Sequence, residues 1–286
     1  MRVGEPYVSE KGHLMKRYFD EGKFIRLCQD FKFLAQKIND SEGELDLRLR
    51  DNYFNLYYKG NSLAKVTSRK KDYEVAIHKK FIKSIFDDDK RFTIKRPSKA
   101  DYCYIYTGSD LLPSLFQEKH LNKLCSNIKE EHYSEEITFE QMLITDNMDR
   151  KDLLIIDRQV TETRMPGKLD LLALKQKNGN NFYLQILEVK LGNNKELKED
   201  VGEQLDRYVQ YIVSHIGDWG RCYEEVYKQM KELGLLRQLP WDRIKIIDEV
   251  KGYVVVGGYS GIAKNMLNNL KIQYPKLEIK QFVNKL

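Results

Sequence analysis

The feature that most constrains this fold is a pair of apolar runs joined by a short polar turn. The runs are Leu169–Leu174 and Phe182–Leu191, and Asn178-Gly179-Asn180-Asn181 lies between them. An Asn-Gly turn between two strand-like runs predicts an antiparallel hairpin. Runs this continuous are typical of strands covered on both faces. We therefore expect the hairpin to belong to a sheet with helices on both sides.

The rest of the C-terminal half predicts further elements around this hairpin. Strands are expected at Leu153–Ile156, Tyr253–Val256 and Leu277–Phe282. Helices are expected from Asp200 to about Ile216 and from Ala263 to Gln273, and Thr138-Phe139-Glu140-Gln141 resembles a capping box at the start of a short helix. The order β-β-β-α-β-α-β behind a leading helix predicts an α/β sandwich with a mixed β-sheet.

The N-terminal half predicts a smaller α+β unit. Strands are expected at Leu45–Arg50, Tyr53–Lys59 and Leu63–Val66, with short ones near Phe92–Ile94 and Tyr102–Tyr106. Helices are expected at His13–Ile38, broken near Gly22, and at Tyr73–Phe86. Thr107-Gly108-Ser109-Asp110 predicts a boundary between two domains, 1–108 and 109–286. The first domain is expected to bind nucleic acid, mediate dimerisation or contact a partner protein.

Composition predicts a globular, water-soluble protein. Hydrophobic residues make up 41% of the 286 and charged residues 32%. No apolar run approaches the ~20 residues that span a bilayer, and the first residues lack the apolar core of a signal peptide. The four cysteines lie far apart, which favours free thiols over a zinc or iron–sulfur site. These observations predict a cytoplasmic protein.

Net charge favours a polyanionic partner without proving one. The chain carries a formal charge of +6, and basic residues outnumber acidic ones between Lys59 and Lys99. A solvated surface is the simpler interpretation of this segment. Tyr53, Phe54, Tyr57 and Tyr58 could stack on unpaired bases, but packing within a hairpin is the favoured interpretation.

Two acids and a lysine lie where the hairpin strands meet. Asp170 begins the first strand, and Glu188 and Lys190 share one face near the end of the second. Two converging carboxylates repel each other unless they are protonated or share a cation. Oxygen ligands with water and phosphate favour Mg²⁺ or Mn²⁺ over zinc. The pattern predicts metal-assisted hydrolysis of a phosphodiester.

The following helix offers Gln204 and Tyr208 to the same site. Both lie on a stripe offset by roughly 90° from the apolar stripe of that helix. They are expected to bind a substrate phosphate or to orient Lys190. The lysine itself has two open roles, because its charge could stabilise the attacked phosphate or a lowered pKa could let it deprotonate water.

The order of these residues carries the prediction, since Glu-x-Lys alone also occurs at Glu21, Glu196, Glu249 and Glu278. Gly167–Asp170, Glu188–Lys190 and Gln204–Tyr208 resemble the motifs of the RecB-like branch of the PD-(D/E)XK nuclease superfamily. The chain is also similar to the nuclease domain of the NucS/EndoMS mismatch endonucleases in the segments GKLDLLAL, LQILEVKLG and VGEQLDRYVQYI. The resemblance covers about a fifth of the chain.

The resemblance implies a restriction-endonuclease-like fold and a role for each motif residue. Asp170 and Glu188 would be metal ligands, Lys190 the catalytic lysine, and Gln204 and Tyr208 supporting residues. The family often adds a glutamate from the helix before the first strand. Glu140 is the first choice for it, Glu136 and Glu131 compete, and Asp157 either approaches the metal or is an ordinary strand-end acid.

We expect a Mg²⁺- or Mn²⁺-dependent nuclease, with DNA favoured over RNA and endonuclease over exonuclease. The alternative is a nucleic-acid-binding protein that keeps the fold without catalysis. A third hypothesis is a structural protein with these charges by coincidence, which would place Asp170 and Glu188 on opposite faces of the sheet. A homodimer stays open, because one active site cuts one strand. No P-loop motif is present, so no ATP motor is expected.

Overall fold

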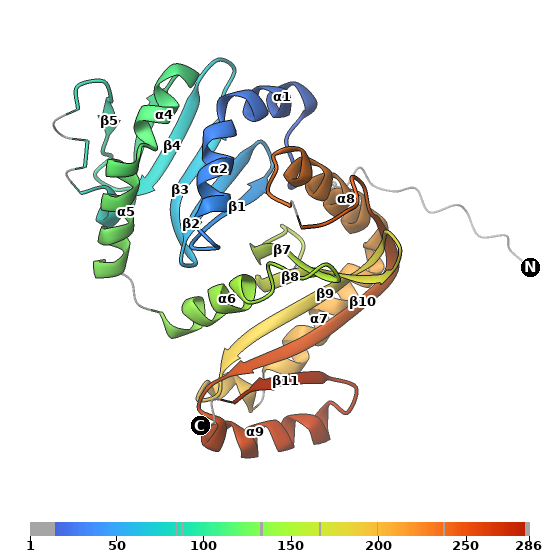
Figure 1. The fold of residues 1–286 in the computed structure, drawn as a ribbon. Helices are drawn as coiled ribbons and strands as arrows, with labels where there is room; N and C mark the ends of the chain where they lie inside the picture. The colour runs from blue at the N-terminus through green and yellow to red at the C-terminus, as the bar shows by residue number, and fades with distance from the viewer. Residues whose placement is uncertain are drawn as a thin grey trace, which may run out of the picture.

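The computed structural model contains two β-sheets flanked by helices (Figure 1). It describes residues 15–83, 85–86, 89–131, 134–165, 167–198, 200–236 and 238–283. The mixed α/β class expected from the sequence is confirmed. Within the described part of the chain, no helix is long and apolar enough to cross a membrane.

The N-terminal sheet is antiparallel and has six strands in the order β1-β2-β3-β4-β6-β5. Its strands are β1 (Leu45–Arg50), β2 (Tyr53–Tyr58), β3 (Asn61–Ser68), β4 (Tyr73–His78), β5 (Ile94–Lys95) and β6 (Tyr102–Thr107). The helices of this half are α1 (Glu21–Asp30), α2 (Lys32–Asp40), α3 (Lys79–Ile82), the 3-10 turn η1 (Ser109–Leu111), α4 (Leu112–Leu115) and α5 (Glu118–Glu131).

The second sheet has five strands in the order β11-β10-β9-β8-β7. The strands are β7 (Leu153–Val160), β8 (Leu169–Asn178), β9 (Asn181–Leu191), β10 (Lys245–Gly257) and β11 (Glu278–Phe282). Strands β7, β8 and β9 are antiparallel neighbours, whereas β9, β10 and β11 are parallel. The hairpin predicted from the Asn-Gly turn is therefore confirmed, with β9 at the centre of the sheet.

Helices cover both faces of this second sheet, as the unbroken apolar runs predict. The described helices of this half are α6 (Glu135–Thr145), the 3-10 turn η2 (Lys195–Leu197), α7 (Val201–Ser214), α8 (Ile216–Glu232) and α9 (Ser260–Gln273). Helix α6 packs on the face that carries Leu171 and Val189. Helices α7 and α8 pack on the opposite face, which carries Leu172 and Ile186. In Figure 1, α9 and β11 lie at the end of the molecule farthest from the N-terminal sheet.

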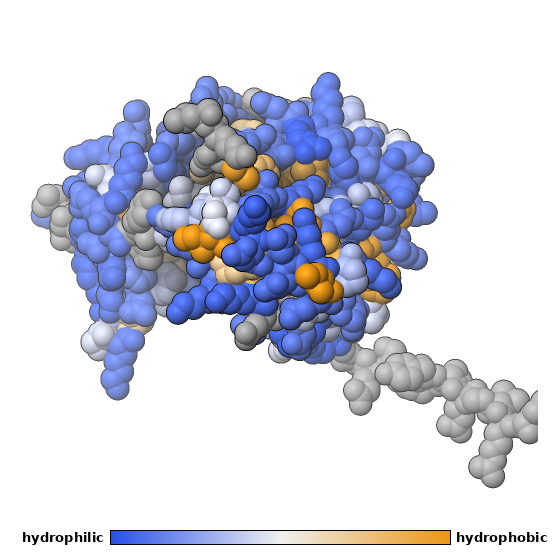
Figure 2. Space-filling model, turned by 90° about the horizontal axis from the view of Figure 1, so that it is seen from below, coloured by the Kyte–Doolittle hydropathy of each residue, from blue (hydrophilic) through white to orange (hydrophobic). Residues whose placement is uncertain are grey.

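The surface seen from the α9 side is mainly hydrophilic, with small separate apolar spots (Figure 2). Two of the exposed apolar side chains on the elements at this end are Ile262 and Phe282, at 56% and 47% exposure. Single exposed apolar residues are normal on a protein surface.

The helix expected at Tyr73–Phe86 is wrong over its first half. Residues 73–78 form strand β4, and only Lys79–Ile82 is helical. Tyr73, Val75 and Ile77 are all at most 1% exposed, so aromatic and β-branched residues recur with the period of a strand. Pairing with β3 and β6 on both sides then stabilises the extended form.

Two other boundaries differ from those expected, and one helix was not expected. The expected start at His13 lies outside the described residues, and the first helix begins at Glu21. The helical segment breaks at Phe31 rather than near Gly22, and there the Phe31 ring packs edge-on against Phe54. Helix α6 begins at Glu135 with Ser134 as its N-cap, so the capping box proposed at Thr138–Gln141 lies inside the helix. Helix α8 was not expected, although its buried aromatic residues recur at helical spacing at Trp219, Tyr223 and Tyr227.

A buried ion cluster joins the two sheets at β7. The Asp157 carboxylate lies 2.5 Å from Arg17 Nε and 2.6 Å from Arg50 Nη1, and it accepts a hydrogen bond of 2.9 Å from Tyr223 Oη. Burial alone would raise the pKa of Asp157, but the two arginine charges outweigh burial and lower it. Asp157 is thus a structural anion whose charge is balanced by two arginines. The domain boundary between residues 108 and 109 stays a prediction.

Candidate active site

Asp170 and Glu188 converge on one face of the second sheet. Leu171 of β8 lies opposite Leu187 of β9, so Asp170 and Glu188 are the next residues along each strand. The two side chains act on each other directly, because the charge of Asp170 raises the pKa of Glu188, and the charge of Asp170 also reaches Glu136 and Glu140 on α6. The third hypothesis, which required opposite faces, is wrong on this point.

Burial disfavours the ionised form of both carboxylates. Glu188 is 1% exposed and Asp170 is 7% exposed. Burial, and next the charge of Asp170, raise the pKa of Glu188 to about 8. Burial also raises the pKa of Asp170, although the Lys190 charge opposes that rise. In the metal-free protein the pair therefore tends to retain a proton at neutral pH.

The oxygens of the two acids are unequally satisfied. Asp170 Oδ2 accepts a 2.9 Å hydrogen bond from the Val189 amide. Glu188 Oε1 lies 2.9 Å from Lys190 Nζ without hydrogen-bond geometry, and Glu188 Oε2 has no hydrogen-bond partner among the described residues. A buried carboxylate oxygen that lacks a partner is an exception in folded proteins and calls for a ligand or water. An oxygen of this kind beside a second carboxylate suits a hard divalent cation. Without a cation, the proton that the pair retains can join Glu188 to Asp170.

The donor set fits a metal whose remaining ligands come from water and substrate. Among the described residues, no group of three or more histidine, cysteine, aspartate or glutamate side chains is close enough to hold a metal by itself. Mg²⁺ binds readily through one or two carboxylates plus waters and phosphate oxygens. Asp170 and Glu188 thus fit Mg²⁺ or Mn²⁺ better than zinc, which prefers a complete nitrogen and sulfur shell.

Lys190 carries a retained positive charge at this site. Its ammonium lies 2.9 Å from Glu188 Oε1 and 2.9 Å from Glu196 Oε2. Burial alone would lower the pKa of Lys190, but the charges of Glu188, Glu196 and Asp170 outweigh burial and raise it. Of the two roles left open by the sequence, the geometry favours charge stabilisation over deprotonation of water.

Gln204 and Tyr208 lie beside the start of β8. Tyr208 Oη accepts a 2.9 Å hydrogen bond from Gln204 Nε2 and one of 3.1 Å from the Lys168 amide. Gly167 has a φ of +97°, and a Cβ atom there would lie 2.4 Å from Tyr208 Oη. The glycine is needed both for its left-handed backbone and for this close approach. The amide therefore holds the phenol, and the phenol holds the backbone before Asp170. Among the described residues, neither side chain forms a hydrogen bond with Lys190.

The acids of α6 take different positions around the site. Glu140 is 2% exposed; it pairs with Arg158 at 3.0 Å and accepts hydrogen bonds from Gln159. Burial raises the pKa of Glu140 to about 7 against the opposing charge of Arg158, and Asp170 adds to the rise. Both oxygens of Glu140 thus already have partners within the protein.

Glu136 has the more open position of the two. It is half-buried, and Asn194 donates a 3.4 Å hydrogen bond to it. Burial raises the pKa of Glu136, with Lys190 opposing and Asp170 adding to the rise. Glu131 lies on α5 and pairs with Lys83 at 3.3 Å. Glu136 is therefore the better placed competitor of Glu140 for the upstream acid.

The aromatic hairpin of the N-terminal sheet is mostly packed, as the favoured interpretation predicts. Phe54, Tyr57 and Tyr58 are at most 6% exposed. Tyr53 is half-buried, with Lys65 Nζ 4.1 Å from its ring centroid. These rings form part of the sheet rather than a free stacking platform.

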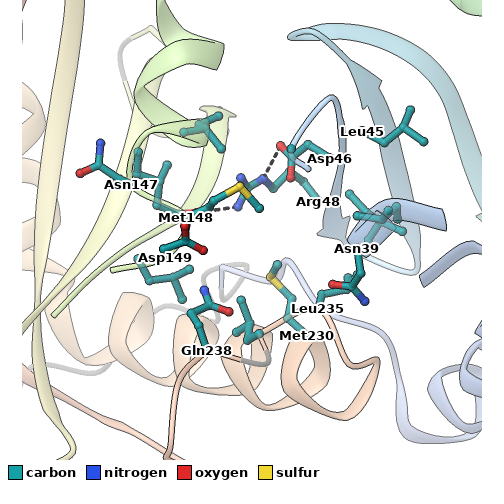
Figure 3. Close-up of a pocket in the computed structure, with 17 residues that line it drawn as sticks. Asn39, Leu45, Asp46, Arg48, Asn147, Met148, Asp149, Met230, Leu235 and Gln238 are labelled. Carbon is teal, nitrogen blue, oxygen red and sulfur yellow. Dashed lines mark hydrogen bonds and ion pairs between the residues drawn. The ribbon is translucent and has the colours of Figure 1, made fainter. Parts of the chain in front are cut away.

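A cavity of about 250 Å³ lies between the two sheets, away from the paired acids (Figure 3). Its wall includes Arg48, which donates hydrogen bonds to Asp46 at 2.8 Å and to the Ile155 carbonyl at 2.7 Å. Figure 3 shows Met148 and Met230 also at this cavity. It borders the start of β7, whereas the acids lie at the other end of the neighbouring strand β8.

Comparison with known proteins adds little to this description. No protein-family model matches the chain, and no curated protein matches it. A crystal structure of a repair endonuclease from Pyrococcus abyssi is 15% identical, with a TM-score of 0.26, covering 84% of this chain and 78% of the other. A structure of an EndoMS complex with double-stranded DNA is 11% identical, with a TM-score of 0.27, covering 85% and 78%. Identities and TM-scores this low do not establish a function for this chain.

Proposed function

We propose that this protein is a metal-dependent nuclease that hydrolyses phosphodiester bonds. One observation carries the proposal: Asp170 and Glu188 lie together and buried, Lys190 Nζ lies 2.9 Å from Glu188 Oε1, and Glu188 Oε2 has no hydrogen-bond partner among the described residues. Structural carboxylates elsewhere in the chain, such as Asp157, have their charge balanced by arginines. DNA in preference to RNA, and endonuclease in preference to exonuclease, are proposed on the motif resemblance of residues 167–208.

In this proposal each residue has a distinct task. Asp170 and Glu188 hold Mg²⁺ or Mn²⁺, which supplies Lewis acidity toward a phosphate and its attacking water. Lys190 holds a positive charge where negative charge develops on the phosphate. Tyr208, held by Gln204, fixes the Gly167–Lys168 backbone and so the position of Asp170. Glu136 or Glu140 adds negative charge from α6.

A cleavage assay with purified full-length protein tests the proposal. Linear duplex, circular plasmid, single-stranded DNA and RNA are each incubated with Mg²⁺ or Mn²⁺ and, separately, with chelator. We expect cleavage of at least one DNA substrate that requires the cation and is lost in Glu188→Gln. No cleavage of any substrate by folded wild-type protein with either cation would reject the nuclease.

One observation favours the alternative of a binding protein without catalysis. Exposed basic residues, among them Lys70, Lys71 and Lys80, lie next to the two ends of strand β4 in the N-terminal sheet. This alternative predicts nucleic-acid binding that survives chelation and falls steeply with salt, without cleavage. The same substrates, measured for binding and for cleavage, separate the two functions.

A further inference from the structure

The loop after β9 places a third acid, Glu196, beside Lys190. Three contacts fix this loop: the Gly192 amide donates to the Gly257 carbonyl at 3.0 Å, Leu197 is fully buried, and Asn194 accepts a 3.0 Å hydrogen bond from the Glu196 amide. Because the backbone is anchored on both sides of Glu196, its position beside Lys190 is built into the fold. In the sequence, Glu196 is only the first residue of one of several Glu-x-Lys segments.

The two acids that contact Lys190 differ in how easily they can leave it. The side chain of Glu188 is 1% exposed, whereas that of Glu196 is 48% exposed. A half-exposed carboxylate regains its hydration when it turns away, whereas a buried one does not. Glu196 is therefore the removable partner of the ammonium.

We propose that Glu196 is a positioning residue that competes with the nucleic-acid backbone for Lys190. A carboxylate oxygen and a phosphate oxygen accept the same charge-assisted hydrogen bond from an ammonium group. Without substrate, Glu196 holds the lysine beside Glu188; a backbone phosphate takes its place when substrate binds. This inference rests on the proposed function, because it assigns to Lys190 the phosphate that the nuclease cuts.

Competition predicts a change in affinity rather than in chemistry. Glu196→Gln keeps the shape of the side chain and removes the charge that repels phosphate. We expect KM and the dissociation constant for DNA to fall by about threefold to tenfold at ~50 mM salt, the order of effect of one nearby charge at a protein surface. The value of kcat should stay within about twofold, because Asp170, Glu188 and Lys190 are unchanged.

The experiment compares full-length variants by steady-state cleavage with Mg²⁺ and by fluorescence anisotropy of a labelled oligonucleotide with Ca²⁺. Glu203→Gln is the matched control, because Glu203 is 65% exposed on α7 and pairs with Arg207. Glu196→Asp keeps the charge and should stay within about twofold of wild type. Unfolding midpoints establish that all variants are folded.

The outcomes separate this inference from the proposed function. Equal effects of Glu196→Gln and Glu203→Gln, weaker binding by Glu196→Gln, or tighter binding by Glu196→Asp would each overturn the competition. Wild-type protein that binds DNA without cutting it, while Glu196→Gln binds it more tightly, would reject the nuclease and keep the competition. Wild-type protein that neither binds nor cuts would reject both.

Discussion

Two Glu-x-Lys segments lie on neighbouring strands of one sheet, and only one of them forms a candidate active site. Glu188–Lys190 is on β9 and Glu249–Lys251 is on β10, which pairs with β9 in parallel. The side chain of Glu188 is 1% exposed and that of Glu249 is 27% exposed. Glu249 pairs with Lys177 at 3.0 Å and Lys251 at 3.5 Å, and these partners lower its pKa, whereas burial and Asp170 raise that of Glu188 to about 8.

The difference shows that the Glu-x-Lys spacing by itself does not form a candidate active site. What distinguishes Glu188 is a second buried acid across the hairpin and an oxygen without a partner. Glu249 has neither, and its cation pairs are of the exposed kind that contribute little to stability. The same spacing therefore gives a surface ion pair on one strand and a candidate metal site on the next.

The largest expected difference between the two segments is in catalysis. Glu188→Gln removes a proposed metal ligand, so we expect cleavage to fall by at least about a hundredfold. Glu249→Gln should keep cleavage within about twofold of wild type. Initial rates on one DNA substrate with Mg²⁺ measure both. Comparable losses in the two variants would show that the buried pair is not the active site.

A smaller effect is expected from the backbone that holds Asp170. Gly167→Ala places a Cβ atom against Tyr208 Oη and forces alanine to a φ of +97°. Gly179→Ala is the matched control, because Gly179 also has a positive φ, of +48°, but no neighbour within 4 Å of an added Cβ. We expect the control to lose about 1–2 kcal/mol of unfolding free energy from its backbone alone. Gly167→Ala should lose more, and should also lose activity.

Removing the phenol oxygen tests the cause of that loss. Tyr208→Phe in the Gly167→Ala background relieves the closest contact, so the double variant should be more stable than the sum of the two single changes predicts. Chemical denaturation of the four proteins measures this coupling. Strictly additive losses would mean that the Gly167–Tyr208 contact does not set the position of the strand.

The smallest expected difference is in how divalent cations stabilise the fold as pH changes. Burial and the charge of Asp170 raise the pKa of Glu188 to about 8, so the pair of acids tends to hold a proton at neutral pH that a cation must displace. Apparent affinity should therefore rise with pH, by at most about tenfold per unit, and level off above about pH 8. The shift in unfolding midpoint caused by Mn²⁺ should be larger at about pH 8.5 than at about pH 6.5.

Glu249 gives the comparison its internal control. Glu249→Gln should keep the pH-dependent Mn²⁺ shift, because its lowered pKa leaves it ionised throughout this range. Glu188→Gln should lose the shift. A shift of the same size at both pH values in wild type would contradict the raised pKa of Glu188.

The sequence predicts the second sheet better than the first for a physical reason. The hairpin of β8 and β9 is specified locally by two apolar runs and an Asn-Gly turn, and its register follows. Strand β4 alternates at Tyr73, Val75 and Ile77, but Ile77, Phe81, Ile82 and Ile85 suggest a helix locally, and pairing with β3 and β6 stabilises the strand. Helix α8 was predictable, because Trp219, Tyr223 and Tyr227 recur at helical spacing.

The candidate site was predictable only in its central part. Strand alternation alone places Asp170, Glu188 and Lys190 together, because all three belong to one hairpin. The contact of Glu196 with Lys190 depends on the path of the loop after β9, for which the sequence offers no periodic pattern. The choice between Glu136 and Glu140 depends on how α6 is placed, and Arg158, which binds Glu140, comes from a strand with a bulge.

The ion cluster around Asp157 has a consequence for anyone who divides this chain. Its two arginine partners, Arg17 and Arg50, come from the first fifty residues, whereas Asp157 lies on β7. A fragment of residues 109–286 would keep the anion and lose both counterions, a change that costs about 3–5 kcal/mol for each broken buried pair. The N-terminal half thus stabilises the half that carries the candidate site, and a fragment without it should unfold more easily than the full chain.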